Sequence, residues 1–446
     1  MSLSSTIRDP DQQGSPQLRV RRAWWLVGLG ILIPGSPQLL AGGHRLGRFG
    51  VGSTFVFWVL AVGALLVYGL ARPLFLAVAT NVFALFAVQL VLAFYAVLWV
   101  ILGLDTLRII RLVRLPGAMR IAVAGLSIVA MVVTAGGIGY AATVTNAARG
   151  LLDTVFSGGS IEPPIDGRYN ILLLGGDAGP DRLGLRPDSI SVASIDAETG
   201  AATMIGIPRN LEQVRFSDGS PLWDDFPDGY DCGDECLISY LYTYGEEHPD
   251  LYPDALGEGS EPGIEAMRDA VEGVTGLQLQ YYVLIDMQGF SQLIDALGGI
   301  DIVVAEKVTL GKNGDAPIGS IPAGAQHMDG YTALWYARSR YNTTDYARME
   351  RQRQVQEAIL LQFEPANVLS KFQAVADAGA QVVKTDIPQG MLAAFVDLAT
   401  KTRALPVTSL ELTPDSGVVT AHPDYDMIHA LVQASLATPS PSATPE

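Results

Sequence analysis

The chain has 446 residues, of which 49% are hydrophobic and 17% charged, and its formal net charge at pH 7 is −17. Residues 1–143 hold 11 Lys+Arg and 3 Asp+Glu, a net charge of +8, whereas residues 144–446 hold 18 and 43, a net charge of −25. The acidic part argues against nucleic acid as a partner. The basic and apolar part is typical of a protein that meets a membrane.

Three long apolar runs dominate the first 143 residues. Residues 51–70, 74–104 and 121–144 contain no Lys, Arg, Asp or Glu. Runs of about 20 residues can cross a hydrocarbon core, so we predict three membrane spans rather than three buried helices of a soluble domain. No cleavable signal peptide is evident, so we expect the anchor to stay attached.

The arginine positions predict how this region is oriented. Residues 105–120 carry four arginines and should be cytoplasmic, so the span after them exports the large domain. Counting back through the two preceding spans places Arg45 and Arg48 in the cytoplasm as well. Arg19, Arg21 and Arg22 also favour the cytoplasm. Both conditions hold only if residues 24–43 enter and leave the membrane on the same face, turning at Pro34 to Pro37. We therefore predict the following order: a disordered cytoplasmic tail (1–23), a re-entrant hairpin (24–43) and three spans, together a transmembrane region over 24–144.

Beyond a linker at 145–167, residues 168–436 predict one α/β domain, followed by a disordered tail at 437–446. Strands are expected at 170–176, 189–196, 203–207, 281–287, 300–306, 333–340, 409–413 and 417–421. Helices are expected at 265–276, 290–299, 350–363, 389–402 and 424–436. This alternation predicts an extracytoplasmic three-layer α/β/α domain with a mixed sheet, preceded by the α-helical transmembrane region.

The chain has two cysteines, Cys232 and Cys236. Two cysteines do not complete a zinc site without histidines nearby, and the closest, His248, is isolated. A disulfide in an oxidising compartment fits better than two free thiols.

Five arginines lie within sixteen residues between Arg338 and Arg353. Arg338 and Arg340 alternate on an expected strand, and Arg348, Arg351 and Gln352 recur at helical spacing. Guanidinium groups match phosphate oxygens bidentately, so the cluster indicates a phosphate or pyrophosphate ligand. A solvated helix paired with its own acidic residues is the alternative.

Carboxylates and further arginines follow the ends of the first strands. Asp177 follows a strand that ends in glycines, Arg186 and Asp188 precede the next strand, and Arg209 follows the third. Ends of adjacent strands converge at one edge of an α/β sheet. Asp177 and Asp188 could therefore hold Mg²⁺ against a phosphate, or form salt bridges with the arginines instead.

Several of these segments, in this order and spacing, resemble the LytR-CpsA-Psr family over about residues 168–435. They are NILLLGGDAG, RPDSI, IPRN, LIDALGGIDI, the run G-x-Q-x-M-D-G-Y-x-A-L-W-Y-A-R-S-R, and DYARMERQRQV. The resemblance implies a bacterial enzyme that is a multi-pass protein of the cell membrane, with its catalytic domain outside the cytoplasm. Such enzymes transfer glycopolymers from a polyprenyl-pyrophosphate carrier to peptidoglycan with Mg²⁺.

By motif position, the resemblance also implies roles for individual residues. Asp177 and Asp188 resemble the metal ligands, and with Arg209 and Arg340 they form the implied catalytic set. The implied pyrophosphate-binding set is Arg186, Arg209, Arg338, Arg340, Arg348 and Gln352, and Asp345 and Arg351 belong to the same motif. Two positions depart from the family pattern: Asn210 replaces an aspartate, and Leu237 replaces a basic residue.

Two alternatives to the transferase stay open. A polyprenyl-pyrophosphate hydrolase would use the same residues with water as the acceptor. A non-catalytic glycolipid-binding or regulatory membrane protein would need no intact metal and arginine motifs.

Overall fold

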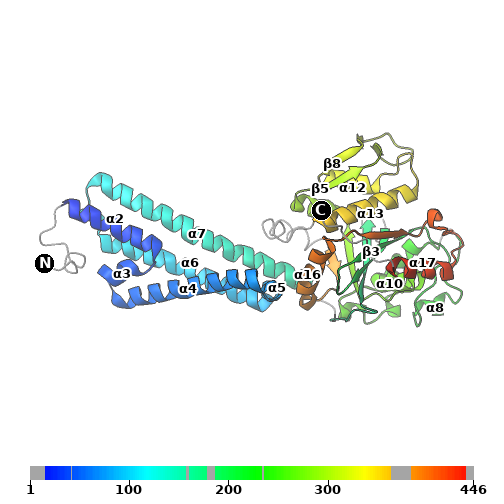
Figure 1. The fold of residues 1–446 in the computed structure, drawn as a ribbon, viewed down its shortest axis with the longest axis horizontal. Helices are drawn as coiled ribbons and strands as arrows, with labels where there is room; N and C mark the ends of the chain where they lie inside the picture. The colour runs from blue at the N-terminus through cyan, green and yellow to red at the C-terminus, as the bar shows by residue number, and fades with distance from the viewer. Residues whose placement is uncertain are drawn as a thin grey trace. The chain divides into compact units, whose positions relative to one another are not determined.

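A computed structural model describes residues 16–41, 43–156, 160–177, 186–233, 236–362 and 383–437. The chain divides into two compact units, residues 1–149 and residues 150–446 (Figure 1). The predicted tail segments 1–15 and 438–446 lie outside the described residues.

Unit 1 is entirely helical in the part that the structure describes. Its elements are α2 (Pro16–Leu32), α3 (Ser36–Ala41), α4 (His44–Leu70), α5 (Arg72–Ala79), α6 (Val82–Ile110), η1 (Leu112–Arg114) and α7 (Gly117–Val155) as far as residue 149. Three stretches are long and apolar enough to cross a membrane: His44–Leu70, Val82–Arg114 and Gly117–Gly150. These are candidate spans, in the same order as the three that the sequence predicts.

The first two helices form a hairpin. The chain turns at residues 33–35, and Pro37 is the second residue of α3, where a missing N–H costs little. A Cβ atom on Gly35 would lie 2.5 Å from the backbone nitrogen of Val51, so glycine permits close packing on α4. The fully buried Gln38 side chain donates to the carbonyl of Leu102 at 2.8 Å, which ties α3 to α6.

Three predicted boundaries in this region are wrong. Residues 16–23, predicted to be disordered, form the first turns of α2 because Ala23 packs into the helical core. The predicted run 74–104 breaks at Thr80 and Asn81, where the Asn81 side chain accepts a hydrogen bond from the Ala84 N–H and caps α6. The predicted linker 145–167 is helical as far as Val155.

The centre of unit 2 is a six-stranded mixed sheet of order β10-β3-β2-β1-β4-β9. Its strands are β1 (Arg168–Asp177), β2 (Arg186–Asp196), β3 (Ala202–Ile207), β4 (Tyr281–Asp286), β9 (Val383–Thr385) and β10 (Thr408–Glu411). β1 pairs with β4 and β10 with β3 in parallel, and the other three pairs are antiparallel. The predicted mixed sheet is confirmed.

Alternate residues of the strands face different helices. On one face, Leu172 and Val192 pack in the core against Ala266 and Met267 of α10 (Pro262–Thr275) and against α17 (Tyr425–Ala437). On the other face, Ile171 and its neighbours pack against α16 (Leu392–Thr402). The domain therefore has the three layers that the alternation predicts.

A second, smaller core lies beside the sheet. It is formed by α11 (Met287–Leu297), β5 (Ile300–Val304), β6 (Val308–Leu310), β7 (Gly319–Ile321), β8 (Gly324–Met328), α12 (Gly330–Arg338) and α13 (Asp345–Gln362). The remaining elements are α8 (Leu222–Asp225), η2 (Ile238–Tyr240), α9 (Leu241–Glu247), η3 (Pro249–Leu251), η4 (Ala255–Glu258), η5 (Gln389–Met391) and η6 (Pro414–Ser416).

The strand predicted at 333–340 is wrong, because most of it forms α12. The Asp329 side chain accepts a hydrogen bond of 2.8 Å from the Thr332 N–H and starts this helix. Ala333 and Tyr336, three residues apart, turn into the smaller core. Arg338 thus ends a helix and Arg340 follows in a loop, so the two do not alternate on a strand.

Two further strand predictions need correction. Residues 417–421 form no strand, because the helical turn η6 ends at Gly417 with φ +88°. The strand predicted at 300–306 exists as β5, but it pairs with β8 outside the six-stranded sheet.

Candidate functional site

A β-bulge places Asp188 at the edge of the sheet. Across β1 and β2, Gly175 pairs with Ser189 and Gly176 with Pro187, so Asp188 is the extra residue of β2. A bulge re-aims a side chain and is frequent beside functional sites. Asp177 ends β1 opposite Arg186, and its side chain lies outside the described residues.

Asp188 forms ion pairs with two arginines from different elements. Its Oδ1 accepts a hydrogen bond from Nη1 of Arg209, which follows β3, and lies 3.8 Å from Nη1 of Arg348 on α13. The Asp188 side chain is 12% exposed, so solvent screens these pairs little. The strand ends therefore meet at one edge, as the sequence predicts.

A second carboxylate, that of Asp345, extends this network. It accepts a hydrogen bond of 2.9 Å from Nη2 of Arg348. It also lies 3.5 Å from Nε of Arg209 and 3.7 Å from Nη1 of Arg340. Two carboxylates thus hold three guanidinium groups together, which leaves one positive charge in excess.

Arg348 lies beneath the site rather than in its wall. Its side chain is 2% exposed, and burial lowers the pKa of its guanidinium while Asp345 and Asp188 raise it. An arginine this deep fixes its two carboxylate partners. The wall residues Arg209 and Arg340 are 28% and 35% exposed and can meet a ligand from solvent.

These side chains open onto a pocket of about 580 Å³. It is lined by Arg186, Asp188, Arg209, Asn210, Leu237, Ser239, Tyr240 and Arg340. Three of the six predicted pyrophosphate-binding residues therefore line one cavity, and both positions that depart from the family pattern, Asn210 and Leu237, line it too.

One wall of the pocket is the segment after the cysteines. Ile238 and Ser239 donate backbone hydrogen bonds to the carbonyls of Leu211 (2.9 Å) and Arg209 (3.3 Å). The Arg186 guanidinium carbon lies 4.4 Å from the centre of the Tyr240 ring, a cation–π contact. Sequence reasoning missed Tyr240, because nothing in its local pattern connects it to Arg186.

The structure joins Cys232 and Cys236 in a disulfide. Cys236 is buried and directly precedes Leu237 of the pocket wall. The disulfide therefore anchors the start of the segment that carries Ser239 and Tyr240.

The other residues of the arginine motif serve other contacts. Arg351 is 7% exposed and donates hydrogen bonds to the carbonyls of Tyr336 (2.9 Å) and Ser339, so it stabilises the end of α12. The Arg338 guanidinium carbon lies 5.6 Å from the centre of the Trp335 ring. Arg338 and Gln352 are not among the pocket-lining residues.

The donor atoms in the pocket are compatible with Mg²⁺. The described residues contain no group of three or more His, Cys, Asp or Glu that could hold a metal ion. Mg²⁺ needs only one or two carboxylates, because water and substrate phosphate complete its coordination. Asp188 and the buried Oδ1 of Asn210, which has no hydrogen-bond partner among the described residues, offer oxygen atoms in the wall.

The fold and the site together define an α/β domain with an arginine-rich pocket at one sheet edge, preceded in the chain by apolar helices. The chain belongs to the LytR_cpsA_psr family, whose model matches residues 149–436. The predicted membership in this family is thereby confirmed.

Individual relatives are more distant. The chain is 29% identical over 225 residues to the polyisoprenyl-teichoic acid–peptidoglycan teichoic acid transferase TagU of Enterococcus faecalis, which covers 49% of this chain and 61% of the relative. It is 28% identical over 313 residues to the cell wall biosynthesis protein LcpA of Corynebacterium glutamicum. This match covers 62% of this chain and 57% of the relative. The matched part thus spans about three fifths of the length of these relatives.

Among solved structures, the chain is similar to B. subtilis TagV, and the match covers 62% of this chain and 100% of that chain. The sequence identity is 21% and the TM-score is 0.43.

Proposed function

We propose that this protein is a membrane-anchored phosphotransferase that moves a glycopolymer from a polyprenyl-pyrophosphate carrier to peptidoglycan. The observation that carries the proposal is the pocket lined by Arg186, Arg209, Arg340 and Asp188. Family membership and the names of the relatives support the same activity.

The charge of the pocket fits a pyrophosphate diester. Its lining has three arginines against one aspartate, so it carries net positive charge and matches a doubly ionised ligand. Guanidinium forks bind phosphate oxygens bidentately, and such charge-assisted bonds are the stronger kind. Asp188 and Asp345 hold Arg209 in place before a ligand arrives.

The reaction follows from this placement. The acceptor hydroxyl attacks the phosphorus next to the glycan and the phosphoanhydride bond breaks. Polyprenyl monophosphate leaves with the bonding electron pair and takes up the proton that the hydroxyl loses. Arg209 and Arg340 neutralise the charge that develops on the leaving phosphate. The glycan keeps one phosphate, which becomes a phosphodiester with the acceptor.

Asp177 and Asp188 would hold Mg²⁺ in this proposal. When bound, the ion neutralises phosphate charge and orients the phosphate oxygens. β1 and β2 are neighbours in the sheet, with Asp177 opposite Arg186 and Asp188 two residues further along β2, which supports placing both residues at the same end of these strands.

We also propose that the catalytic unit lies outside the cytoplasm of a bacterium and that the apolar helices anchor it in the cell membrane. The four arginines of residues 105–120 support this orientation through the positive-inside rule. The disulfide supports an oxidising compartment.

A transfer assay with the full-length protein tests the proposal. Polyprenyl-pyrophosphate carrying a radiolabelled glycan is incubated with peptidoglycan and Mg²⁺, and label in insoluble peptidoglycan is measured. We expect transfer by the wild type and strong loss in Arg340→Ala, whereas Lys384→Ala, which removes a surface cation of β9, keeps it. Free labelled glycan phosphate would indicate a hydrolase, and binding without turnover would indicate a glycolipid-binding protein.

A further inference from the structure

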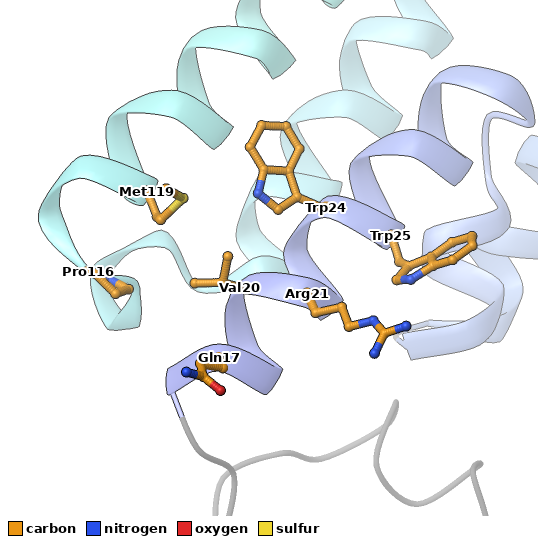
Figure 2. Close-up of a pocket in the computed structure, with 7 residues that line it drawn as sticks. All are labelled: Gln17, Val20, Arg21, Trp24, Trp25, Pro116 and Met119. Atoms are coloured by element: carbon orange, nitrogen blue, oxygen red, sulfur yellow. The ribbon is translucent and has the colours of Figure 1, made fainter.

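A pocket of about 660 Å³ lies in unit 1, between the first turns of α2 and the start of α7. It is lined by Gln17, Val20, Arg21, Trp24, Trp25, Pro116 and Met119. Figure 2 shows Val20 and Trp24 of α2 facing Pro116 and Met119, with Arg21 extending alongside Trp25 at the rim. The pocket is thus apolar inside and cationic at its edge.

Packing on the other side of α2 holds the walls in place. Ala23, Leu26 and Val27 are at most 3% exposed and pack in a core with Ile110 and Val123. On the pocket side, by contrast, Gln17, Arg21, Trp24 and Trp25 are exposed.

The turn between α6 and α7 is also fixed. Arg120 donates hydrogen bonds to the carbonyls of Val113 (3.1 Å) and Leu115 (3.4 Å), which closes the turn before Pro116. The first N–H groups of α7 lack intrahelical acceptors and add positive charge beside Pro116.

Cations gather at this end of the unit. Of the eleven arginines between residues 16 and 149, nine lie at the starts of α2, α4 and α7 or at the end of α6, and Arg72 and Arg149 lie at the other helix ends (Figure 1). The sequence up to residue 143 has three acidic residues, Asp9, Asp11 and Asp105. This excess of positive charge favours anionic ligands at this end of the unit.

The aromatic side chains indicate where the anions come from. Trp24 is 38% and Trp25 63% exposed, and tryptophan is enriched where lipid headgroups meet acyl chains. An apolar cavity with a guanidinium at its rim matches a molecule that has both a phosphate group and an acyl chain.

We propose that this pocket binds one anionic glycerophospholipid, with its phosphate beside Arg21 and an acyl chain between Trp24 and Met119. This site is separate from the arginine-rich pocket of unit 2, and it does not depend on the proposed transferase activity.

Tryptophan quenching in nanodiscs tests the site. Full-length protein is placed in two kinds of phosphatidylcholine nanodisc. One contains a small fraction of phosphatidylglycerol with brominated acyl chains, and the other contains the same fraction of phosphatidylcholine with brominated acyl chains. The contribution of Trp24 is the difference between wild type and Trp24→Phe. An arginine near an anionic surface contributes ~1 kcal/mol, so Arg21→Gln should lower the preference for brominated phosphatidylglycerol about fivefold.

Arg149→Gln is the matched control, because it removes the same charge near the other end of α7. We expect it to keep the preference. Native mass spectrometry of the same variants, counting retained phosphatidylglycerol, provides a second measurement. Equal quenching of wild-type Trp24 by the two brominated lipids, or an unchanged preference in Arg21→Gln, would overturn the proposal.

Discussion

Arg348 on α13 donates a hydrogen bond of 2.9 Å to Asp345, one turn earlier on the same helix, and lies 3.8 Å from Asp188 on β2. One buried cation thereby joins the helix of the arginine motif to the strand that carries the proposed metal ligand. This contact makes Arg348 a positioning residue for the pocket, whereas Arg340 lines it.

Arg348→Met should therefore destabilise unit 2. The substitution removes the buried donor of Asp345 and the buried cation beside Asp188, and a buried acceptor that loses its donor costs about 1–3 kcal/mol. Denaturant unfolding of the full-length protein measures the loss. Arg340→Ala is the matched control, because its side chain is 35% exposed and should change stability by less than ~1 kcal/mol. Equal destabilisation by the two variants would contradict the assignment of Arg348 to the buried network.

Asp188→Asn should abolish most Mg²⁺-dependent turnover, because it removes a proposed metal ligand while keeping the shape of the side chain. Unfolding should be affected modestly, by about 1–3 kcal/mol, since Asp345 still compensates Arg348. The measurement is glycan transfer as a function of Mg²⁺ concentration. Asp196→Asn, at the other end of β2, is the control; a Mg²⁺ dependence unaltered in Asp188→Asn would reject Asp188 as a ligand.

Glu411 on β10 makes stability depend on pH. Burial raises the pKa of its carboxyl to about 7, although Arg353 lies 3.1 Å away and opposes the shift. The folded state thus holds a proton that the unfolded chain releases between about pH 4.5 and pH 7, so stability falls as pH rises through this window.

Glu411→Gln cannot ionise, so its free energy of unfolding should not decrease with pH in this window through residue 411. The stability of the variant relative to wild type should therefore rise by roughly 1–3 kcal/mol from about pH 5 to pH 8. Denaturant unfolding at both pH values measures it, with the exposed Glu258→Gln as control. Parallel pH profiles for wild type and Glu411→Gln would rule out a buried, protonated Glu411.

The topology proposal is tested by labelling a cysteine placed at Gln12. The native cysteines form a disulfide and do not react, so a membrane-impermeant maleimide reports the new thiol alone. We expect no labelling of Gln12→Cys in intact cells and full labelling after permeabilisation. Lys312→Cys, exposed in unit 2, should react in intact cells; labelling of position 12 from outside would instead indicate four spans and an external N-terminus.

Much of unit 2 could be predicted from sequence periodicity. Short apolar runs predict the buried strands at the centre of the sheet, and apolar residues at helical spacing predict the amphipathic α10. The local pattern of residues 333–340 predicts a strand, but the Asp329 cap and the small second core, both outside that pattern, favour a helix. The ion pair of Asp188 with Arg209 could be predicted because both residues lie at the ends of neighbouring strands. The cation–π contact of Arg186 with Tyr240 could not, because a long loop brings Tyr240 to the site.

The central claim is best tested by the mass balance of the reaction. Full-length protein is incubated with polyprenyl-pyrophosphate-linked glycan and peptidoglycan, the peptidoglycan is digested with a muramidase, and soluble fragments and lipids are analysed by mass spectrometry. The account predicts muropeptides carrying the glycan through one phosphate, together with an equal amount of polyprenyl monophosphate. Polyprenyl monophosphate accompanied by free glycan phosphate and unmodified muropeptides would contradict it.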